Sequence, residues 1–321
     1  MIATSDSVTR HAESAAPAVR RHKARPVPLT DASERRLGTA RDYVALSKPN
    51  ILLMSVLMAG LGILLAPDSL GLARSLMVLV GTGLIVSSAN ALNMVLERDV
   101  DGLMARTKGR PLPTGRMGLW PALTFGVFLG IGGTVVLFLW GNPLTAGLGY
   151  TALVSYVALY TPAKRYTPQA LLIGAIPGAM PPLMGWTAVT GSMDAPGLTL
   201  FLILLLWQLP HFIAIALYRQ SEYARAGFKT VPNVRGVTIA KVQTVAYAVL
   251  LVPLCLLLTP IGAATWIYGA VSLLTSVGFL AVCLRGVTTE LPARWARRVF
   301  LASLVFLPAL GVGLGLDRWI G

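Results

Sequence analysis

Nine apolar runs, each close to the length that crosses a lipid bilayer, constrain the fold of this chain more than any other feature. A helix of about 20 residues spans the hydrocarbon core and satisfies its own backbone hydrogen bonds there. Only 12% of the 321 residues are charged, about half the share in soluble domains. We therefore expect an all-α polytopic membrane protein with nine spans. The runs cover residues of about 50–66, 74–97, 118–140, 143–161, 169–190, 198–218, 237–259, 262–284 and 299–316.

Positive charge is distributed unequally between the two sides that nine spans would create. All 27 lysines and arginines except Arg74 and Arg318 lie in the N-terminal segment or in and beside the connections that follow the second, fourth, sixth and eighth runs. Lysine and arginine accumulate on the cytoplasmic side of membrane proteins, so we expect the N-terminus and the longer loops there. The formal net charge of +14 follows from this topology, and no nucleic-acid partner is expected.

The first 41 residues lack an apolar period and are rich in Ala, Ser, Pro and Arg, a composition typical of a disordered tail. We therefore divide the chain into this basic tail, residues 1–41, and a membrane domain, residues 42–321. The expected location is a bacterial inner membrane, and the mitochondrial inner membrane is the alternative. A mitochondrial transit peptide is disfavoured by the acidic residues of the tail, which are Asp6, Glu13, Asp31 and Glu34.

Three oxygen-bearing side chains at the end of the second run form the most informative motif. Asn93, Glu97 and Asp101 are spaced four residues apart, which places them on one face of a helix. Such oxygens suit Mg²⁺, which combines a few carboxylates with water and phosphate oxygens. The basic residues that follow would complete a diphosphate site, and these are Arg106, Lys108, Arg110 and Arg116. The alternative is a helix end with ordinary i,i+4 pairs and a positive cytoplasmic loop.

Further polar groups lie on the same expected side of the membrane. Glu222 follows the sixth run in LYRQSEYARAGFKTVPNVRG, four residues after Tyr218, and is surrounded by Arg219, Arg225 and Lys229. It is a candidate second metal carboxylate or, equally, a loop acid paired with a neighbouring arginine. Lys164 and Arg165 follow the fourth run.

His211 is the one histidine beyond the N-terminal tail, and it lies within the sixth run directly after Pro210. An ionisable side chain inside the membrane is a candidate functional residue. It could ligate haem, carry a proton, or pack against a backbone carbonyl that Pro210 leaves free. The fifth run contains GAIPGAMPPLMGW, whose glycines favour close helix packing and whose prolines favour a bent segment that lines a cavity.

These segments together resemble the membrane prenyltransferase superfamily typified by 4-hydroxybenzoate polyprenyltransferase. Its first Asp-rich motif matches Asn93, Glu97 and Asp101, with a glutamate where much of the superfamily has aspartate. YTPAKRYTPQ, GAIPGAMPPLMGWTAVTG, WQLPHF and EYARAGFKTVP are similar to segments of the protoheme IX farnesyltransferase (haem O synthase) family. The second superfamily motif, DxxxD, departs from the pattern, because Tyr218 and Glu222 occupy its acidic places.

The resemblance implies a nine-helix bundle around a central cavity that is open to the cytoplasm. It implies Mg²⁺-dependent transfer of a farnesyl group from farnesyl diphosphate to a vinyl group of haem B, which gives haem O and pyrophosphate. A haem A synthase or terminal oxidase assembly factors would be the downstream partners. Asn93, Glu97, Asp101 and Glu222 would hold the metal, and His211 would orient haem. The implied diphosphate ligands are Arg106, Lys108, Arg110, Lys164, Arg165 and Arg219. A prenyltransferase for an aromatic quinone precursor is the alternative enzyme, and a transporter is the rival class.

Overall fold

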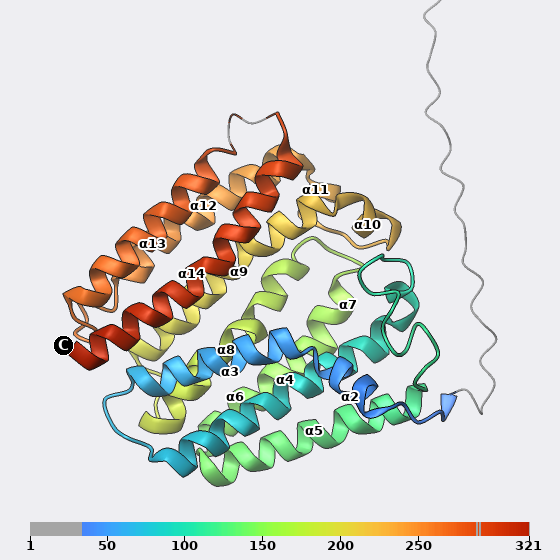
Figure 1. The fold of residues 1–321 in the computed structure, drawn as a ribbon, viewed down its shortest axis with the longest axis horizontal. Coiled ribbons are helices and arrows are strands. Elements are labelled where there is room, and N and C mark those ends of the chain that lie inside the picture. The colour runs from blue at the N-terminus through green and yellow to red at the C-terminus, as the bar shows by residue number, and fades with distance from the viewer. Residues whose placement is uncertain (1–33, 287, 289, 321) are drawn as a thin grey trace, which may run out of the picture.

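The computed structural model describes residues 34–286, 288 and 290–320 (Figure 1). Every regular element in this part of the chain is a helix. In chain order the elements are α2 (Ala40–Ser47), α3 (Pro49–Leu65), α4 (Leu72–Asp101), α5 (Leu119–Trp140), α6 (Pro143–Val154), the π-helical segment η1 (Ser155–Tyr160), α7 (Thr161–Ala163), α8 (Ala170–Thr190), α9 (Ala195–Tyr218), α10 (Gln220–Arg225), α11 (Val231–Val234), α12 (Gly236–Leu256), α13 (Trp266–Leu284) and α14 (Pro292–Ile320).

Seven helices among the described residues are long and apolar enough to cross a membrane, namely α4, α5, α8, α9, α12, α13 and α14. Helices α2 and α3 meet this criterion only as a pair that is bent by 51°, which raises the number to eight. The expected span at about 143–161 is divided among α6, η1 and α7. The all-α membrane fold is therefore confirmed, whereas the count of nine spans stays a prediction. Most of the predicted tail, residues 1–33, lies outside the described residues.

The helices form two packed groups, which Figure 1 shows side by side. One group contains α9, α12, α13 and α14, whose buried side chains form the largest apolar cluster. The other contains α4, α5, α6 and α8, and its cluster includes Val78, Ile85, Leu137 and Met184. Helix α8 packs against both α3 and α9 and so connects the groups. Cys255 and Cys283 are free, buried thiols, as their apolar surroundings predict.

Helices α3 and α8 approach so closely that glycine is required on both. A Cβ atom at Gly62 would overlap the carbonyl oxygen of Pro182, and one at Gly185 would overlap that of Ala59. Backbone contact of this kind is the usual reason for small residues between membrane helices. The predicted packing role of the fifth run is therefore confirmed for Gly185. Its three prolines lie within one continuous, largely buried helix, α8.

A bend at Lys48 separates α2 from α3. Lys48 has a φ of 50° and is the one non-glycine residue with positive φ in the described part of the chain. Pro49 begins α3, and a residue that precedes proline is disfavoured in the right-handed helical region. The bend therefore stops α2 one residue before Lys48 and directs the chain into α3.

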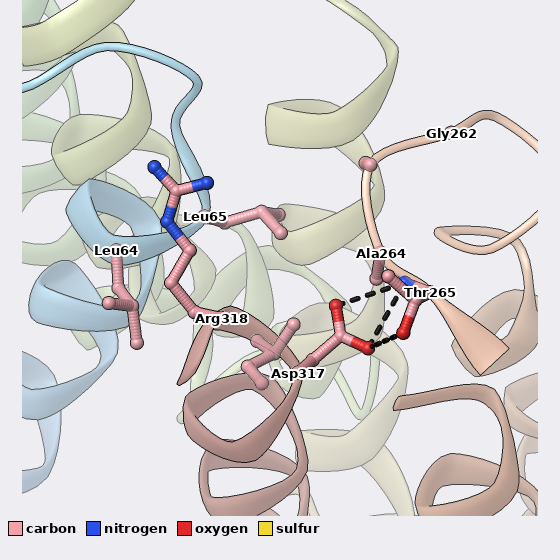
Figure 2. Close-up of a pocket in the computed structure, with 9 residues that line it drawn as sticks. Leu64, Leu65, Gly262, Ala264, Thr265, Asp317 and Arg318 are labelled. Carbon is pink, nitrogen blue, oxygen red and sulfur yellow. Dashed lines mark hydrogen bonds between the residues drawn. The ribbon is translucent and has the colours of Figure 1, made fainter. Parts of the chain in front are cut away.

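A pocket of about 450 Å³ lies where α3 and α14 end and α13 begins (Figure 2). Asp317 faces the start of α13 there, and its carboxylate accepts hydrogen bonds from the backbone amides of Thr265 (2.9 Å) and Tyr268 (3.0 Å). A carboxylate at a helix N-terminus satisfies amides that lack helical partners. The pocket is at the opposite end of α4 from Asp101, and Asp317 has a structural function in it.

Candidate active site

The last two turns of α4 present the predicted motif on one buried face. Asn93, Glu97 and Asp101 are 1%, 5% and 1% exposed, although each carries a strongly polar group. Burying such groups is costly unless they are paired. Their partners therefore define the site.

Each of the three motif side chains receives a hydrogen bond from a cation in a different part of the chain. The pairs are Lys48 Nζ with Asn93 Oδ1 (2.9 Å), Lys164 Nζ with Glu97 Oε1 (2.8 Å), and an Arg110 guanidinium nitrogen with Asp101 Oδ2 (2.7 Å). Three cations thus surround two carboxylates and one amide. This arrangement can accept a further anionic group.

The oxygen atoms of the motif also fit a hard divalent cation. Asp101 Oδ1 is buried and has no hydrogen-bond partner among the described residues, so it is a carboxylate oxygen with an unused lone pair. Asn93 donates its amide nitrogen to Thr161 Oγ1 (3.1 Å), which turns its carbonyl oxygen toward Lys48. Carboxylate and amide oxygens are ligands that Mg²⁺ accepts. No group of three acidic, histidine or cysteine side chains suited to a metal occurs among the described residues, so Asn93 would have to contribute.

The loop after α4 folds back over the end of the motif. Thr107 donates its hydroxyl to the carbonyl oxygen of Asp101 (2.7 Å), which holds Arg110 near the carboxylate. Arg106 instead donates to the hydroxyl of Tyr223 (3.1 Å). Arg116 pairs with Asp42 of α2 at 2.9 Å. Of the basic residues predicted in the loop after α4, Arg110 is therefore the one that directly contacts the motif.

Glu222 is held by a near neighbour. Its carboxylate accepts from the Arg219 guanidinium at 3.1 Å, and Arg219 also donates to the Tyr218 hydroxyl at 3.2 Å. That hydroxyl, beside the guanidinium, raises the pKa of Arg219 above its ordinary value. The arrangement matches the loop acid paired with an arginine, and the metal-binding role of Glu222 stays a prediction.

Three loops meet at this end of the bundle. Tyr223 and Phe228 from the α9–α12 connection pack with Val100 and Met104 at the end of α4. The backbone amide of Lys229 donates to the carbonyl oxygen of Lys164 (2.9 Å).

A pocket of about 100 Å³ lies at this junction. Its lining combines apolar residues with Lys164 and Lys229. Lys164 also faces the Tyr160 ring at 4.4 Å, so this cation connects the pocket with Glu97. Arg165 contacts the α4 backbone at the carbonyl oxygen of Leu96 (3.3 Å).

The side chain of His211, a residue of α9, lies against α14 and does not contact the motif. Its Nδ1 is 2.7 Å from Ser303 Oγ, so the partner is a hydroxyl and not the backbone carbonyl of the packing alternative. Gln208, three residues earlier, donates to the carbonyl oxygen of Ala175 on α8 (3.4 Å). The WQLPHF segment therefore connects α9 to α8 and to α14.

Comparison with known proteins assigns the family. The model of the UbiA prenyltransferase family matches residues 52–304 of the chain. The chain belongs to this family. Among curated UbiA-type relatives, the protoheme IX farnesyltransferase of Anaeromyxobacter sp. (strain Fw109-5) is 44% identical over 275 residues, which cover 86% of this chain and 93% of the relative. The protein of the same name from Myxococcus xanthus (strain DK1622) is 45% identical, with coverage of 87% and 95%.

Solved structures of UbiA-type proteins have the same fold. A structure concerning digeranylgeranylglyceryl phosphate synthase aligns with a TM-score of 0.74 at 18% identity and covers 87% of this chain and 98% of its own. A UbiA homolog from Archaeoglobus fulgidus bound to GPP and Mg²⁺ aligns with a TM-score of 0.63 at 15% identity, with coverage of 85% and 99%. At these identities the comparison establishes the fold alone.

Three contacts in this UbiA family member were not expected from the sequence, and they involve Lys48, Thr161 and Ser303. Lys48 had a usable signal, because it directly precedes Pro49 at the start of the first apolar run. A cation at that point is on the same expected side as the α4 motif. Thr161 and Ser303 had no such signal, since hydroxyl groups are common in membrane helices.

Proposed function

We propose that this protein transfers the farnesyl group of farnesyl diphosphate to a vinyl group of haem B and so forms haem O. The observation that carries the proposal is the set of three cations around the buried α4 motif, which suits a diphosphate leaving group. The choice of haem as acceptor is supported by relatives at 44% and 45% identity over most of the chain, which are named protoheme IX farnesyltransferase.

The reaction breaks the bond between the allylic carbon and the diphosphate oxygen. A vinyl carbon of haem B forms the new bond to that allylic carbon, and water supplies the hydroxyl group of the resulting hydroxyethyl side chain. Pyrophosphate leaves with the electron pair of the broken bond, and one proton is released. The enzyme must therefore stabilise a leaving anion and keep water away from the allylic cation until the carbon–carbon bond exists.

The cations at the motif perform the first task. Lys48, Arg110 and Lys164 already donate to motif oxygens, and we expect them to share their remaining N–H groups with diphosphate oxygens. Arg106, Lys108, Arg165 and Arg219 are the further diphosphate ligands in this proposal. Of these, Arg219 would first have to release Glu222.

Asn93, Glu97 and Asp101 are the residues that would hold Mg²⁺, with Glu222 as a second site. The metal would supply Lewis-acid stabilisation of the negative charge that develops on the diphosphate. The unpartnered Asp101 oxygen is the best available ligand atom.

Apolar helix faces perform the second task. The pocket beside Lys164 is lined by Leu171, Phe212 and Ile213 among others, and such walls exclude water from the farnesyl chain. His211 is the proposed contact for haem.

The proposed location is a bacterial inner membrane, with the N-terminus and the active-site loops in the cytoplasm. The distribution of lysine and arginine supports this orientation. Haem O would pass to a haem A synthase or to terminal oxidase assembly. Residues 42–321 form the catalytic domain in this proposal.

Incubation of the purified protein in lipid nanodiscs with haem B, farnesyl diphosphate and Mg²⁺ tests the proposal. The expected product is haem O, identified by mass and by its absorption spectrum, together with one pyrophosphate per haem. An Asp101→Asn protein serves as the inactive control. Prenylation of an aromatic quinone precursor in place of haem would assign the alternative enzyme. Absence of any prenyl transfer would contradict both and favour the transporter.

A further inference from the structure

Two polar side chains on one face of α9 form hydrogen bonds with Ser303 of α14. His211 Nδ1 lies 2.7 Å from its hydroxyl oxygen, and Trp207 Nε1 donates to its backbone carbonyl oxygen at 3.0 Å. Trp207 and His211 are four residues apart and therefore share a helix face. Ser303 is fully buried, so these contacts form in the dry interface between the two helices.

The direction of the bond between His211 and Ser303 follows from the hydrogen that the serine has available. The Ser303 hydroxyl donates its single hydrogen to the carbonyl oxygen of Phe300 at 2.6 Å. Its oxygen can then only accept from His211, so Nδ1 of the histidine must carry the hydrogen. In a neutral imidazole the other nitrogen, Nε2, is consequently the bare acceptor.

The imidazole ring is also fixed in orientation. It stacks on Trp207 at a centroid distance of 4.9 Å and lies 5.1 Å from the Phe300 ring. Phe212 meets it edge-on at 5.3 Å. A 180° rotation of the ring about the Cβ–Cγ bond would put Cδ2 in the place of Nδ1 and so would break the bond to Ser303.

Nε2 itself makes no hydrogen bond within the part of the chain that the structure describes, and the residue is 9% exposed. The buried imidazole is thus surrounded by aromatic rings. Its Nδ1 is hydrogen-bonded, whereas its Nε2 has no partner among the described residues. That pattern, in which the distal N–H bonds a protein oxygen, is how proteins commonly prepare histidine to ligate a metal.

We propose that Ser303 is a positioning residue that fixes His211 in the Nδ1–H tautomer, so that Nε2 ligates the iron of the haem acceptor. The assignment rests on the proposed function only for the identity of the acceptor. Neutral imidazole is a common axial ligand of haem iron. An axial bond at this site would hold the porphyrin at a set depth beside α9 and so place a vinyl group for attack.

The competing explanation is a helix clamp, in which the same contacts only hold α9 against α14 and have no role in haem binding. Trp207→Phe separates the two, because it removes the bond to the Ser303 carbonyl but retains an aromatic ring against His211. Ser303→Ala removes the acceptor for Nδ1. A clamp predicts that both variants lose stability and that neither changes haem coordination specifically.

Nitrogen NMR of ¹⁵N-histidine-labelled protein in nanodiscs measures the tautomer directly, with His211→Gln used to assign the signal. The expected wild-type spectrum has a protonated Nδ1 and an unprotonated Nε2. Addition of zinc protoporphyrin, a diamagnetic analogue, should shift Nε2 and leave Nδ1 protonated. An Nε2–H tautomer, or an Nε2 signal that zinc protoporphyrin leaves unchanged, would overturn the proposal even if the variants do not fold.

Haem titration followed by absorbance is the second measurement. Ser303→Ala should weaken haem binding about tenfold or more and alter the Soret band, while Trp207→Phe should change affinity by less than about threefold. Equal effects in both variants, or an unchanged spectrum in a folded Ser303→Ala protein, would support the clamp alone. If wild type ligates haem in this way but makes no haem O, the proposed function fails and the Ser303 assignment stands.

Discussion

Lys48 Nζ donates a 2.9 Å hydrogen bond to Asn93 Oδ1, although 45 residues separate the two in sequence. The bend between α2 and α3 makes this contact possible, because Lys48 is the residue at which the chain turns by 51°. The Lys48 ammonium group therefore reaches the candidate active site from the start of the first span.

Replacement of Lys48 by alanine should lower kcat/KM for farnesyl diphosphate by about 10- to 100-fold, the range for the loss of one hydrogen bond to a charged group. Lys48→Arg should recover part of the activity, since it restores the charge with altered geometry. Steady-state kinetics with varied farnesyl diphosphate measures the effect. Arg318→Ala, at the opposite end of the bundle, is the control and should remain fully active. Wild-type kinetics in Lys48→Ala would remove Lys48 from the diphosphate site.

Asp101→Asn should lower kcat about 100-fold or more while the protein stays folded. Asparagine keeps the shape and still offers an oxygen to Arg110, but it removes the negative charge and the unpartnered carboxylate oxygen. The Mg²⁺ concentration that gives half of the maximal activity should be higher than in wild type, because one metal ligand is lost. Near-normal haem O formation at ordinary Mg²⁺ would contradict the metal assignment.

Local periodicity accounts for the part of the site that the sequence predicts. Asn93, Glu97 and Asp101 lie within one helix, and four-residue spacing alone places them on a shared face. Contacts between helices carry no comparable signal. His211 and Ser303 are 92 residues apart, and both lie in apolar runs where a single polar residue has many potential partners.

The second motif illustrates a different limit of sequence reasoning. Glu222 has the spacing from Tyr218 that a metal ligand would need, yet Arg219, three residues away, pairs with it. Spacing alone cannot separate these outcomes, because a local ion pair and a metal site require the same carboxylate. Hydropathy likewise locates an apolar segment at 143–161 but is insensitive to the π-helical turn of η1 within it.

Cysteine reporters test the expected orientation of the spans. Cysteines at Lys108 and Lys229 should both react with a membrane-impermeant thiol reagent from the cytoplasmic side only. A cysteine at Met193 in the α8–α9 connection, which is half exposed, should react from the opposite side. Met193 is preferable to Asn142, whose side chain accepts from the Thr145 amide and caps α6. The native thiols are buried and give little background. Labelling of Lys108 and Lys229 from opposite faces would separate the two halves of the proposed site.

Close packing of α3 on α8 predicts that Gly185→Ala destabilises the folded protein by about 1–3 kcal/mol or more, because the added methyl would overlap the Ala59 carbonyl oxygen. Gly132→Ala is the matched control, since Gly132 lies within α5 and nothing is near the position of an added Cβ. In a helix that change should be neutral or stabilising by up to about 1 kcal/mol. Thermal unfolding in detergent, followed by intrinsic fluorescence, compares the two variants with wild type. Equal stability of Gly185→Ala and Gly132→Ala would show that the α3–α8 interface tolerates a wider separation than the structure describes.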